Sequence, residues 1–403
     1  LQKAVVNAEI DILKELGVTF MLGVEVGKDY SLAELRQQGY EAFYLAIGAQ
    51  ASRKLNIEGE DARGVFGGVD FLRQINLGSE LRLHGQVIVI GGGNVAIDVA
   101  RSAVRVGAES VMMYCLELRE QMPALKEEID EALAETIDIQ NGWGPKRILT
   151  RDEQVTGVEF KQCVSVFDAQ GRFNPVYDES VTRVVAADAV LVSIGQAIEW
   201  GGLLDNSSAE LNPNRTLKAD ALTYQTGQAD VFVGGDAYTG PRYAIDAIAA
   251  GKQAAISIHR FVHPGQSLTI GRSKREYQAL DKSELNLPGY DRTARQTARQ
   301  IDHAHTNISF QDLRATFTEE QVRKETARCL GCGVTMVTPA LCVGCGVCTT
   351  KCKFEAISLV REFDGAGAAL PDMKPIVIRQ MLKRQVKIVS KKVSKSLKST
   401  FNR

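Results

Sequence analysis

The strongest constraint on the fold lies in residues 86–107, which read QVIVIGGGNVAIDVARSAVRVG. An apolar run predicts a buried strand over 86–90, and this strand leads directly into three glycines. Apolar residues then recur at helical spacing over 94–106, and a second strand is predicted over 110–116. The strand–helix–strand order predicts a βαβ unit, the building block of an α/β fold with a parallel sheet.

The three glycines form a loop whose spacing suits a dinucleotide phosphate. Gly91, Gly93 and Ala96 match the pattern G-x-G-x-x-A. In this pattern the first glycine permits a tight turn, the second lets the pyrophosphate approach the backbone, and the small third residue lets the helix pack closely on the sheet. The helix N-terminus adds free N–H groups that favour an anion. We therefore predict a nucleotide at Gly91, Gly92 and Gly93, with a purely structural glycine turn as the alternative.

The end of the following strand is where such a fold reads the ribose of its cofactor. The sequence there is YCLELR, residues 114–119. An acidic residue favours NAD because it accepts from the ribose 2′-hydroxyl, whereas a basic residue favours NADP because it pairs with the 2′-phosphate. Both kinds are present, as Glu117 and Arg119. The sequence therefore leaves the choice between NAD and NADP open, and the alternative for each residue is a solvated charge at the end of the strand.

A second nucleotide-binding region is predicted downstream. Residues 234–236, GGD, follow a short strand over 231–233 and precede a long helix over 243–262. Asp236 would accept a hydrogen bond from a ribityl or ribose hydroxyl, although an aspartate that caps a helix is the simpler alternative. The strand ends YLAIGA and LVSIGQ echo one another and add Gly195 as a candidate contact. This partial repeat suggests two related nucleotide-binding folds in one chain.

The other elements are predicted from periodicity and turn signals. Further helices are expected over 4–16, 70–77, 123–135, 317–328 and from 375 onward. Further strands are expected over 18–22, 40–47 and 188–194, with a β-rich extension of short strands over 138–185.

Six of the eight cysteines fall within a short segment near the C-terminus. The segment has the spacing C-x2-C, followed by C-x2-C-x2-C-x3-C. The second run matches the bacterial ferredoxin pattern for a 4Fe–4S cluster, whereas zinc sites favour two C-x2-C pairs set further apart. We predict an iron–sulfur site, with zinc or plain thiols as alternatives. The candidate ligands are Cys329, Cys332, Cys342, Cys345, Cys348 and Cys352.

The number of cysteines limits the number of clusters. Two complete clusters need about eight thiolates, and this segment holds six cysteines. One cluster is therefore expected on Cys342, Cys345 and Cys348, with a fourth ligand from Cys352 or from the 329/332 pair. A second, incomplete cluster would need ligands from elsewhere.

Three long motifs resemble one known family. GGGNVAIDVARSAVRVGA, REQMPALKEEIDEALAE and ADVFVGGDAYTGPRYAIDAIAAGKQAA are similar to segments of the glutamate synthase small-subunit-like flavoproteins. This group includes subunits of dihydropyrimidine dehydrogenase-like and electron-bifurcating transhydrogenase enzymes. The similarity runs over about residues 1–263, and ARCLGCG also resembles a segment that follows the linker in many members.

The resemblance implies two interleaved Rossmann-like domains, one for FAD and one for NAD(P)H, followed by a small ferredoxin-like iron–sulfur module. By position, Asn94 and Val95 would join the glycines at the NAD(P) pyrophosphate. Gly235 and Asp236 would contact FAD. Gly240, Pro241 and Ala244 would lie over the flavin side.

The sequence departs from the family pattern in two ways. Members begin with a cysteine-rich region and a first G-x-G-x-x-G loop for FAD, and this sequence starts after both. We expect a longer form of the chain or another chain to supply that loop. Many members also have two adjacent arginines where this chain has Cys115 and Leu116, so NADPH use does not follow from the resemblance.

The expected domain organisation follows the motifs. The FAD-binding parts are expected over 1–83 and 201–263, and the NAD(P)-binding domain over 84–200. A linker over 264–328 then leads to the ferredoxin-type domain over 329–363 and a basic amphipathic tail over 364–403.

The predicted function is an oxidoreductase subunit that moves a hydride between NAD(P)H and FAD, and single electrons between FAD and a 4Fe–4S cluster, in service of a partner enzyme. The alternative is a non-catalytic docking or sensor subunit that binds nucleotide and cluster without turnover. No single catalytic acid–base residue is predicted.

Charge and hydropathy bear on the partners. Residues 373–403 contain ten Lys or Arg and no Asp or Glu, which leaves 38 basic against 49 acidic residues elsewhere. The acidic body gives no reason to expect nucleic acid. The basic tail could contact another redox subunit or an anionic membrane surface, and the alternative is a solvated terminal helix without a partner. With no apolar run of about 18 residues and with clustered cysteines, a cytoplasmic location is expected.

Overall fold

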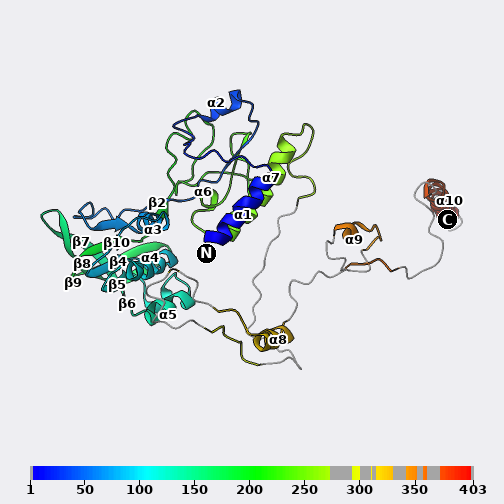
Figure 1. Cartoon of the computed structure of the whole chain (residues 1–403). Coiled ribbons are helices and arrows are strands. Elements are labelled where there is room, and N and C mark those ends of the chain that lie inside the picture. Colours follow the sequence, from blue (N-terminus) through cyan, green and yellow to red (C-terminus); the bar gives the residue numbers. More distant parts are fainter. Residues whose placement is uncertain are drawn as a thin grey trace. The chain divides into compact units, whose positions relative to one another are not determined.

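The computed structural model describes residues 3–272, 293–299, 310, 315–329, 342–351, 357–360 and 373–400, with only the backbone of 351, 373, 376 and 391–400. It divides into two compact units, Leu1–Arg328 and Cys329–Arg403. Figure 1 shows the elements of both units, and each unit is described by itself below.

A five-stranded parallel sheet forms the centre of the first unit. Its order is β3–β10–β4–β5–β6, and each neighbouring pair is parallel. The family resemblance and the prediction of an α/β fold with a parallel sheet agree with this order. The strands are β3 (Val65–Gly67), β10 (Ala189–Val192), β4 (Gln86–Ile90), β5 (Ser110–Cys115) and β6 (Asp138–Asn141).

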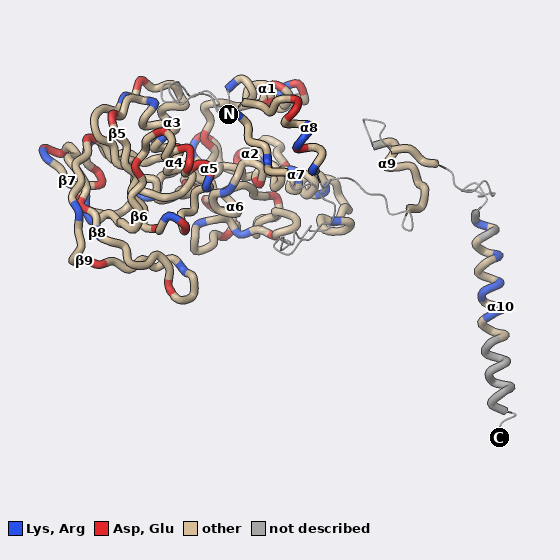
Figure 2. The backbone as a smooth tube through the Cα atoms, turned by 90° about the horizontal axis from the view of Figure 1, so that it is seen from below, with Lys and Arg blue, Asp and Glu red and all other residues tan. Residues whose placement is uncertain are grey.

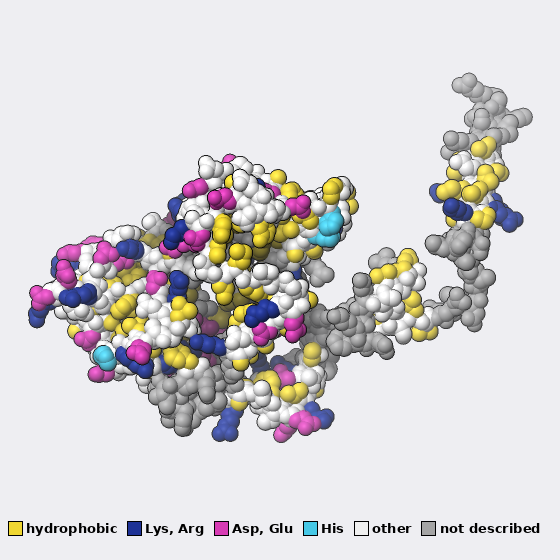
Figure 3. Space-filling model, turned by 45° about the horizontal axis from the view of Figure 1, so that its top comes forward, with side chains coloured by type: hydrophobic (Ala, Val, Ile, Leu, Met, Phe, Trp, Pro, Cys, Tyr) yellow, Lys and Arg dark blue, Asp and Glu magenta, His cyan; other side chains and the backbone are white. Residues whose placement is uncertain are grey.

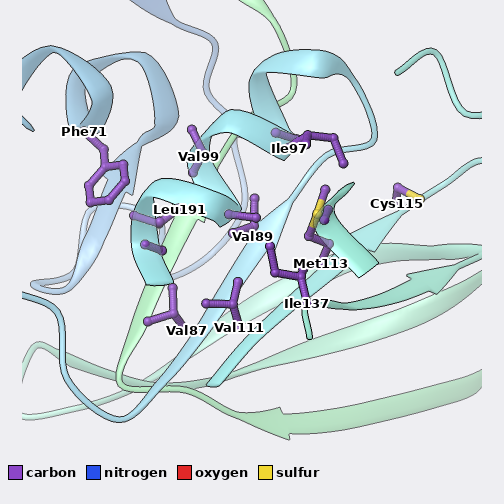
Figure 4. Close-up of a cluster of buried hydrophobic side chains, with 14 of the residues drawn as sticks. Phe71, Val87, Val89, Ile97, Val99, Val111, Met113, Cys115, Ile137 and Leu191 are labelled. Atoms are coloured by element: carbon purple, nitrogen blue, oxygen red, sulfur yellow. The ribbon is translucent and has the colours of Figure 1, made fainter. Parts of the chain in front are cut away.

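One face of this sheet is covered by helices. Val87 and Val89 of β4 point to the same side as Val111 of β5, and all are almost completely buried. Figure 4 shows these side chains beside Ile97 and Val99 of the helix that follows the glycine loop. Ile88 and Ile90 of β4 alternate with these valines and face the opposite side of the sheet, because successive side chains of a strand point to opposite faces. The helices on this face are α3 (Gly68–Asn76), α4 (Asn94–Arg105) and α5 (Lys126–Ala134).

The opposite face is covered by a three-stranded antiparallel sheet. Ile88 and Ile90 of β4 belong to this second core, and the ring of Tyr114 stacks on Phe160 with centroids 4.0 Å apart. The segment predicted as short strands thus forms longer ones, because the strands pair along most of their length. These strands are β7 (Trp143–Arg151), β8 (Gln154–Phe167) and β9 (Phe173–Ala186).

A smaller part of the first unit is built from two distant stretches of sequence. β1 (Phe43–Leu45) pairs in parallel with β12 (Val231–Val233), and Arg36 Nε donates to Asp230 Oδ2 at 2.5 Å beside this pair. β2 (Ala51–Ser52) and β11 (Gln196–Ala197) form an antiparallel pair. The helices here are α1 (Lys3–Glu15), α2 (Leu32–Gln37), α6 (Asp236–Thr239) and α7 (Ala244–Phe261). Segments that come before and after the central-sheet residues 86–192 in the sequence therefore pair with each other. This is the interleaving that the resemblance implies.

The strand predicted over 18–22 is wrong. Those residues form turns and irregular backbone, and Met21 and Leu22 are exposed over 61% and 86% of their surface. An alternating apolar run forms a strand only where another strand accepts its hydrogen bonds, and none pairs with this run among the described residues.

The remaining helices lie toward the C-terminus. The first unit ends with α8 (Glu319–Ala327), and the second contains α9 (Val347–Lys351) and α10 (Met373–Thr400), while the short η1 (Arg119–Gln121) follows β5. Figure 2 shows Lys and Arg without acidic residues along the described part of α10, and Figure 3 shows apolar side chains beside them. Within the described part of the chain, no helix is both long enough and apolar enough to cross a bilayer.

A buried ion cluster joins α4 to the C-terminal end of α5. The carboxylate of Glu135 accepts from Arg101 Nη2 at 2.7 Å and from Arg105 Nη1 at 2.8 Å, and Glu135 is only 2% exposed. Burial raises the pKa of Glu135, but the hydrogen bonds from Arg105 and Arg101 outweigh it and hold the pKa below its ordinary value of 4.5. The two helices are thus locked together by charge.

We predict that Glu135→Gln destabilises the protein by about 3 kcal/mol, because Arg101 and Arg105 each lose hydrogen bonds to a buried carboxylate. Arg101 keeps its ion pair with Glu131, at 2.8 Å, in this variant. The free energy of unfolding in urea measures this cost. Since the folded-state pKa of Glu135 is lowered, its stabilisation is present above pH 4.5 and is lost as pH falls. The difference between variant and wild type should therefore narrow in acid.

The matched control is Glu127→Gln, because Glu127 is an exposed carboxylate in the first turn of the same helix. It should cost less than about 1 kcal/mol. Equal effects of the two substitutions would contradict the importance of the cluster.

Candidate functional site

The glycine loop lies at the carboxyl edge of the parallel sheet. The N–H of Gly91 donates to the carbonyl of Tyr114 at 2.9 Å, and the N–H of Ser193 donates to the carbonyl of Ile90 at 2.8 Å. Gly91 has φ of 141°, and a Cβ there would lie 2.3 Å from the Ser193 carbonyl oxygen. Only glycine fits this turn, as the sequence pattern predicts.

Gly93 has a different reason to be glycine. It precedes α4 with an ordinary φ of −91°, and the nearest atom to an added Cβ would be Pro123 Cγ at 4.0 Å. The fold itself thus tolerates a side chain here. Open space next to the N–H groups at the start of a helix is where a phosphate binds, so this loop fits the pyrophosphate of a dinucleotide.

The segment after η1 braces the loop. Asn94 Oδ1 accepts from the N–H of Leu125 at 2.8 Å, and the Gly92 carbonyl accepts from the N–H of Ala124 at 3.3 Å. The side chain of Asn94 therefore holds the loop rather than pointing freely to a ligand. Val95, a second predicted contact, lies in the first turn of α4 and packs partly against the helix-covered core.

Two buried hydroxyl groups next to the start of α3, Ser52 Oγ and Ser193 Oγ, have no hydrogen-bond partner among the described residues. A Cβ on Gly67 would approach Ser52 Oγ at 2.3 Å, and one on Gly68 would approach Ser193 Oγ at 2.2 Å. Unpaired buried hydroxyls are uncommon in folded proteins and fit a site that a polar ligand completes. Nothing in the sequence pattern marks these serines.

Glu117 and Arg119 diverge in the structure. The Glu117 Oε2 atom lies 3.0 Å from the position of a Cβ on Gly92, so this carboxylate lies over the glycine loop. Arg119 instead pairs with Asp130 of α5, with Nη2 and Oδ1 3.9 Å apart. Of the two candidate ribose-reading residues, the acidic one is therefore at the loop.

Gly195 lies between β10 and β11, directly before β11, where the chain crosses toward the smaller part of the unit. It has φ of 117°, and its carbonyl accepts from the N–H of Arg53 at 3.2 Å. Arg53 Nε also donates to the Gln196 carbonyl at 3.0 Å. The positive φ explains the glycine structurally, and a cofactor contact there stays a prediction.

The predicted FAD residues gather at the carboxyl end of β12. Gly235 has φ of 62° and Gly240 has φ of 76°, and Asp236 starts α6 between them. Asp236 Oδ1 accepts from the N–H of Arg242 at 3.1 Å and closes the turn into α7. One carboxylate oxygen of Asp236 thus serves the local turn. The other candidates, Pro241 and Ala244, are exposed at the start of α7.

The predicted cysteine ligands lie partly outside the described residues, because Cys332 and Cys352 are not described. Cys329, Cys342, Cys345 and Cys348 are exposed. Across the described ranges, no three His, Cys, Asp or Glu side chains are placed together to hold a metal. Gly344 and Gly346 both have positive φ, of 66° and 75°, so the chain turns sharply between the thiols. The iron–sulfur cluster stays a prediction.

Comparison with known families places the chain. Residues 2–251 match the family described as pyridine nucleotide-disulphide oxidoreductase. The chain belongs to this family. Membership confirms the predicted NAD(P)H-dependent oxidoreductase class and supports FAD and NAD(P)H as cofactors of the family. The assignment of each cofactor to the residues described above stays a prediction.

Three curated relatives illustrate the match. The chain is 32% identical over 343 residues to the NADP(+)-dependent formate dehydrogenase subunit beta of Moorella thermoacetica, covering 82% of this chain and 48% of the relative. It is 31% identical over 360 residues to the NADPH-Fe(3+) oxidoreductase subunit beta of Geobacter sulfurreducens, covering 80% of this chain and 53% of that relative. It is 31% identical over 277 residues to the NADPH glutamate synthase small chain of Escherichia coli, covering 64% of this chain and 58% of that relative. The chain spans about half the length of the curated relatives it matches, and the predicted resemblance to glutamate synthase small chains is confirmed.

One solved structure shows the same fold. The structure of Mycobacterium tuberculosis FprA in complex with NADPH aligns with a TM-score of 0.50 and 18% sequence identity, covering 59% of this chain and 67% of FprA. This similarity agrees with the expected α/β fold.

Replacing Gly91 or Gly93 by alanine is expected to have different effects. Gly91→Ala should destabilise the fold, because its methyl group would meet the Ser193 carbonyl. Gly93→Ala should leave the melting temperature nearly unchanged but weaken nucleotide binding by at least about tenfold, because the methyl group fills the space for the pyrophosphate. Thermal melting and titration calorimetry with NADH and NADPH separate the two effects. Full nucleotide affinity in Gly93→Ala would contradict the assignment of this loop.

Proposed function

We propose that the chain is the nucleotide-handling subunit of a larger electron-transfer oxidoreductase, exchanging electrons between NAD(P)H and partner proteins through FAD and an iron–sulfur cluster. The observation that carries the proposal is the open space over Gly93 at the start of α4, next to a turn that only Gly91 can make. A bound flavin supplies the chemistry that joins two-electron hydride donors to one-electron acceptors.

The residues of the chain divide the work of binding. The N–H groups at the start of α4 hold the pyrophosphate of NAD(P)H, and the bonds from Ala124 and Leu125 keep that loop in place. At the second site, the free oxygen of Asp236 accepts from a hydroxyl of FAD, while Gly235 and Gly240 let the backbone pass close to the cofactor.

The cysteine-rich segment is proposed to hold the iron–sulfur cluster. The support is the C-x2-C-x2-C-x3-C spacing and the left-handed glycines between the thiols. Thiolates of Cys342, Cys345 and Cys348 would bind iron, with the fourth ligand from Cys352 or from the 329/332 pair.

Partner proteins are part of the proposal. Relatives that match most of this chain are named as beta subunits of a formate dehydrogenase and of an iron(III) oxidoreductase. The helix α10 offers a contact surface, because its described side chains include exposed Ile378, Leu382 and Val386 among Lys and Arg. A basic amphipathic helix of this kind can bind an acidic protein surface or anionic lipid.

The proposal predicts that the native complex, isolated through a tag on this chain, contains flavin that NADH or NADPH bleaches under anaerobic conditions. Visible absorbance during titration with either nucleotide measures the reduction, and mass spectrometry identifies the partners. Bound flavin that neither nucleotide reduces would favour the docking or sensor alternative. A complex without flavin would rule out the redox function.

A second prediction concerns the thiols. Cys345→Ser should remove most of the iron and the electron paramagnetic resonance signal of the reduced cluster, because one of about four thiolate ligands is lost. Flavin bleaching by nucleotide should persist. The control is Cys163→Ser, because Cys163 is a buried cysteine of β8 outside the cluster. Unchanged iron content in Cys345→Ser would contradict the ligand assignment.

A further inference from the structure

The turn after β5 is held in one conformation by a side chain from the neighbouring strand. Asn141, the last residue of β6, pairs with Cys115 in the parallel ladder. Its Nδ2 donates to the Glu117 carbonyl at 2.9 Å and to Cys115 Sγ at 3.2 Å. The side-chain amide of Asn141 therefore holds both the backbone of Glu117 and the thiol of Cys115.

The thiol of Cys115 adds a second tether to the same carbonyl. Cys115 Sγ lies 3.7 Å from the Glu117 carbonyl oxygen. Burial first, and the nearby charge of Glu117 second, raise the pKa of Cys115 to about 12. The thiol of Cys115 is therefore protonated near neutral pH and donates a hydrogen bond to the Glu117 carbonyl oxygen.

The consequence is the placement of a negative charge at the glycine loop. With its backbone tethered, the Glu117 side chain extends over Gly92, where Oε2 lies 3.0 Å from the position of an added Cβ. Arg119 is the only basic residue in 114–121, and it is turned toward Asp130 of α5. A ligand bound at this loop would lie next to the carboxylate of Glu117. The guanidinium of Arg119 points instead to Asp130.

We propose that this nucleotide site selects NADH over NADPH, with Glu117 as the specificity-determining residue and Asn141 as the positioning residue that holds it. A carboxylate can accept from both hydroxyls of an unmodified adenosine ribose, but it repels a 2′-phosphate. The inference rests on the proposed function, because it names the substrate of the same loop.

The proposal separates this chain from its relatives. The three relatives compared above are named for NADP(+) or NADPH. Here the strand end carries Cys115 and Leu116 followed by an acid. Asn141 holds both Cys115 and Glu117 in this turn, so the strand end directs a carboxylate, and not the guanidinium of Arg119, toward the glycine loop.

The test is titration calorimetry of the full chain with NADH and with NADPH. Wild type should bind NADH at least about tenfold more tightly. In Glu117→Ala, NADH affinity should fall by about tenfold or more, because a hydrogen bond to a charged group is lost. NADPH affinity should rise, because the repulsion is removed. Glu120→Ala removes a neighbouring exposed carboxylate and should leave both affinities unchanged.

Asn141→Ala tests the positioning role. It should lower the preference for NADH while NADPH binding is kept or improved, with a melting temperature near that of wild type. A purely structural role would weaken both nucleotides together.

The outcomes are distinct. Tighter binding of NADPH by wild type would overturn the proposed selectivity while leaving the proposed function intact. A wild-type preference for NADH that survives in Glu117→Ala would overturn the assignment to this residue. Binding of neither nucleotide would overturn the proposed function and this inference with it.

Discussion

The close approach of the Gly91 backbone to the Ser193 carbonyl is the contact on which the rest of the site depends. It brings the end of β4 against the end of β10, so the glycine loop begins at the centre of the sheet. Because β5 pairs on the other side of β4, its last residues lie directly beside the loop. Both the phosphate-binding backbone and the ribose-reading turn are therefore positioned by the register of one short strand.

The scaffold behind the loop is held by charge as well as by apolar packing. Glu135 joins α5 to α4 through two arginines, and the segment just before α5 donates to Asn94 and Gly92. The helix that begins at the loop is thus fixed to α5 near both ends. Such support from outside the contact residues keeps a binding site close to its productive geometry.

Local pattern was enough to predict the elements that are buried on both sides. Strand β4 and the start of α4 have the predicted bounds, because an unbroken apolar run followed by glycine and a helical period allows few alternatives. The strand predicted over 18–22 had a similar apolar run but no partner in the described structure. The lengths of β8 and β9 could not be predicted from the sequence either, because they depend on pairing between residues that are far apart in the sequence.

The same distinction holds within the site. Gly91, Gly93 and Glu117 could be found from spacing, since each has a fixed place relative to its own strand. Asn141 could not, because its role comes from the lateral register of β5 and β6, and no motif records that register. Sequence alone left Glu117 and Arg119 equivalent. The structure shows that Glu117 lies next to the loop while Arg119 faces Asp130, and the proposed preference for NADH rests on this difference in side-chain direction.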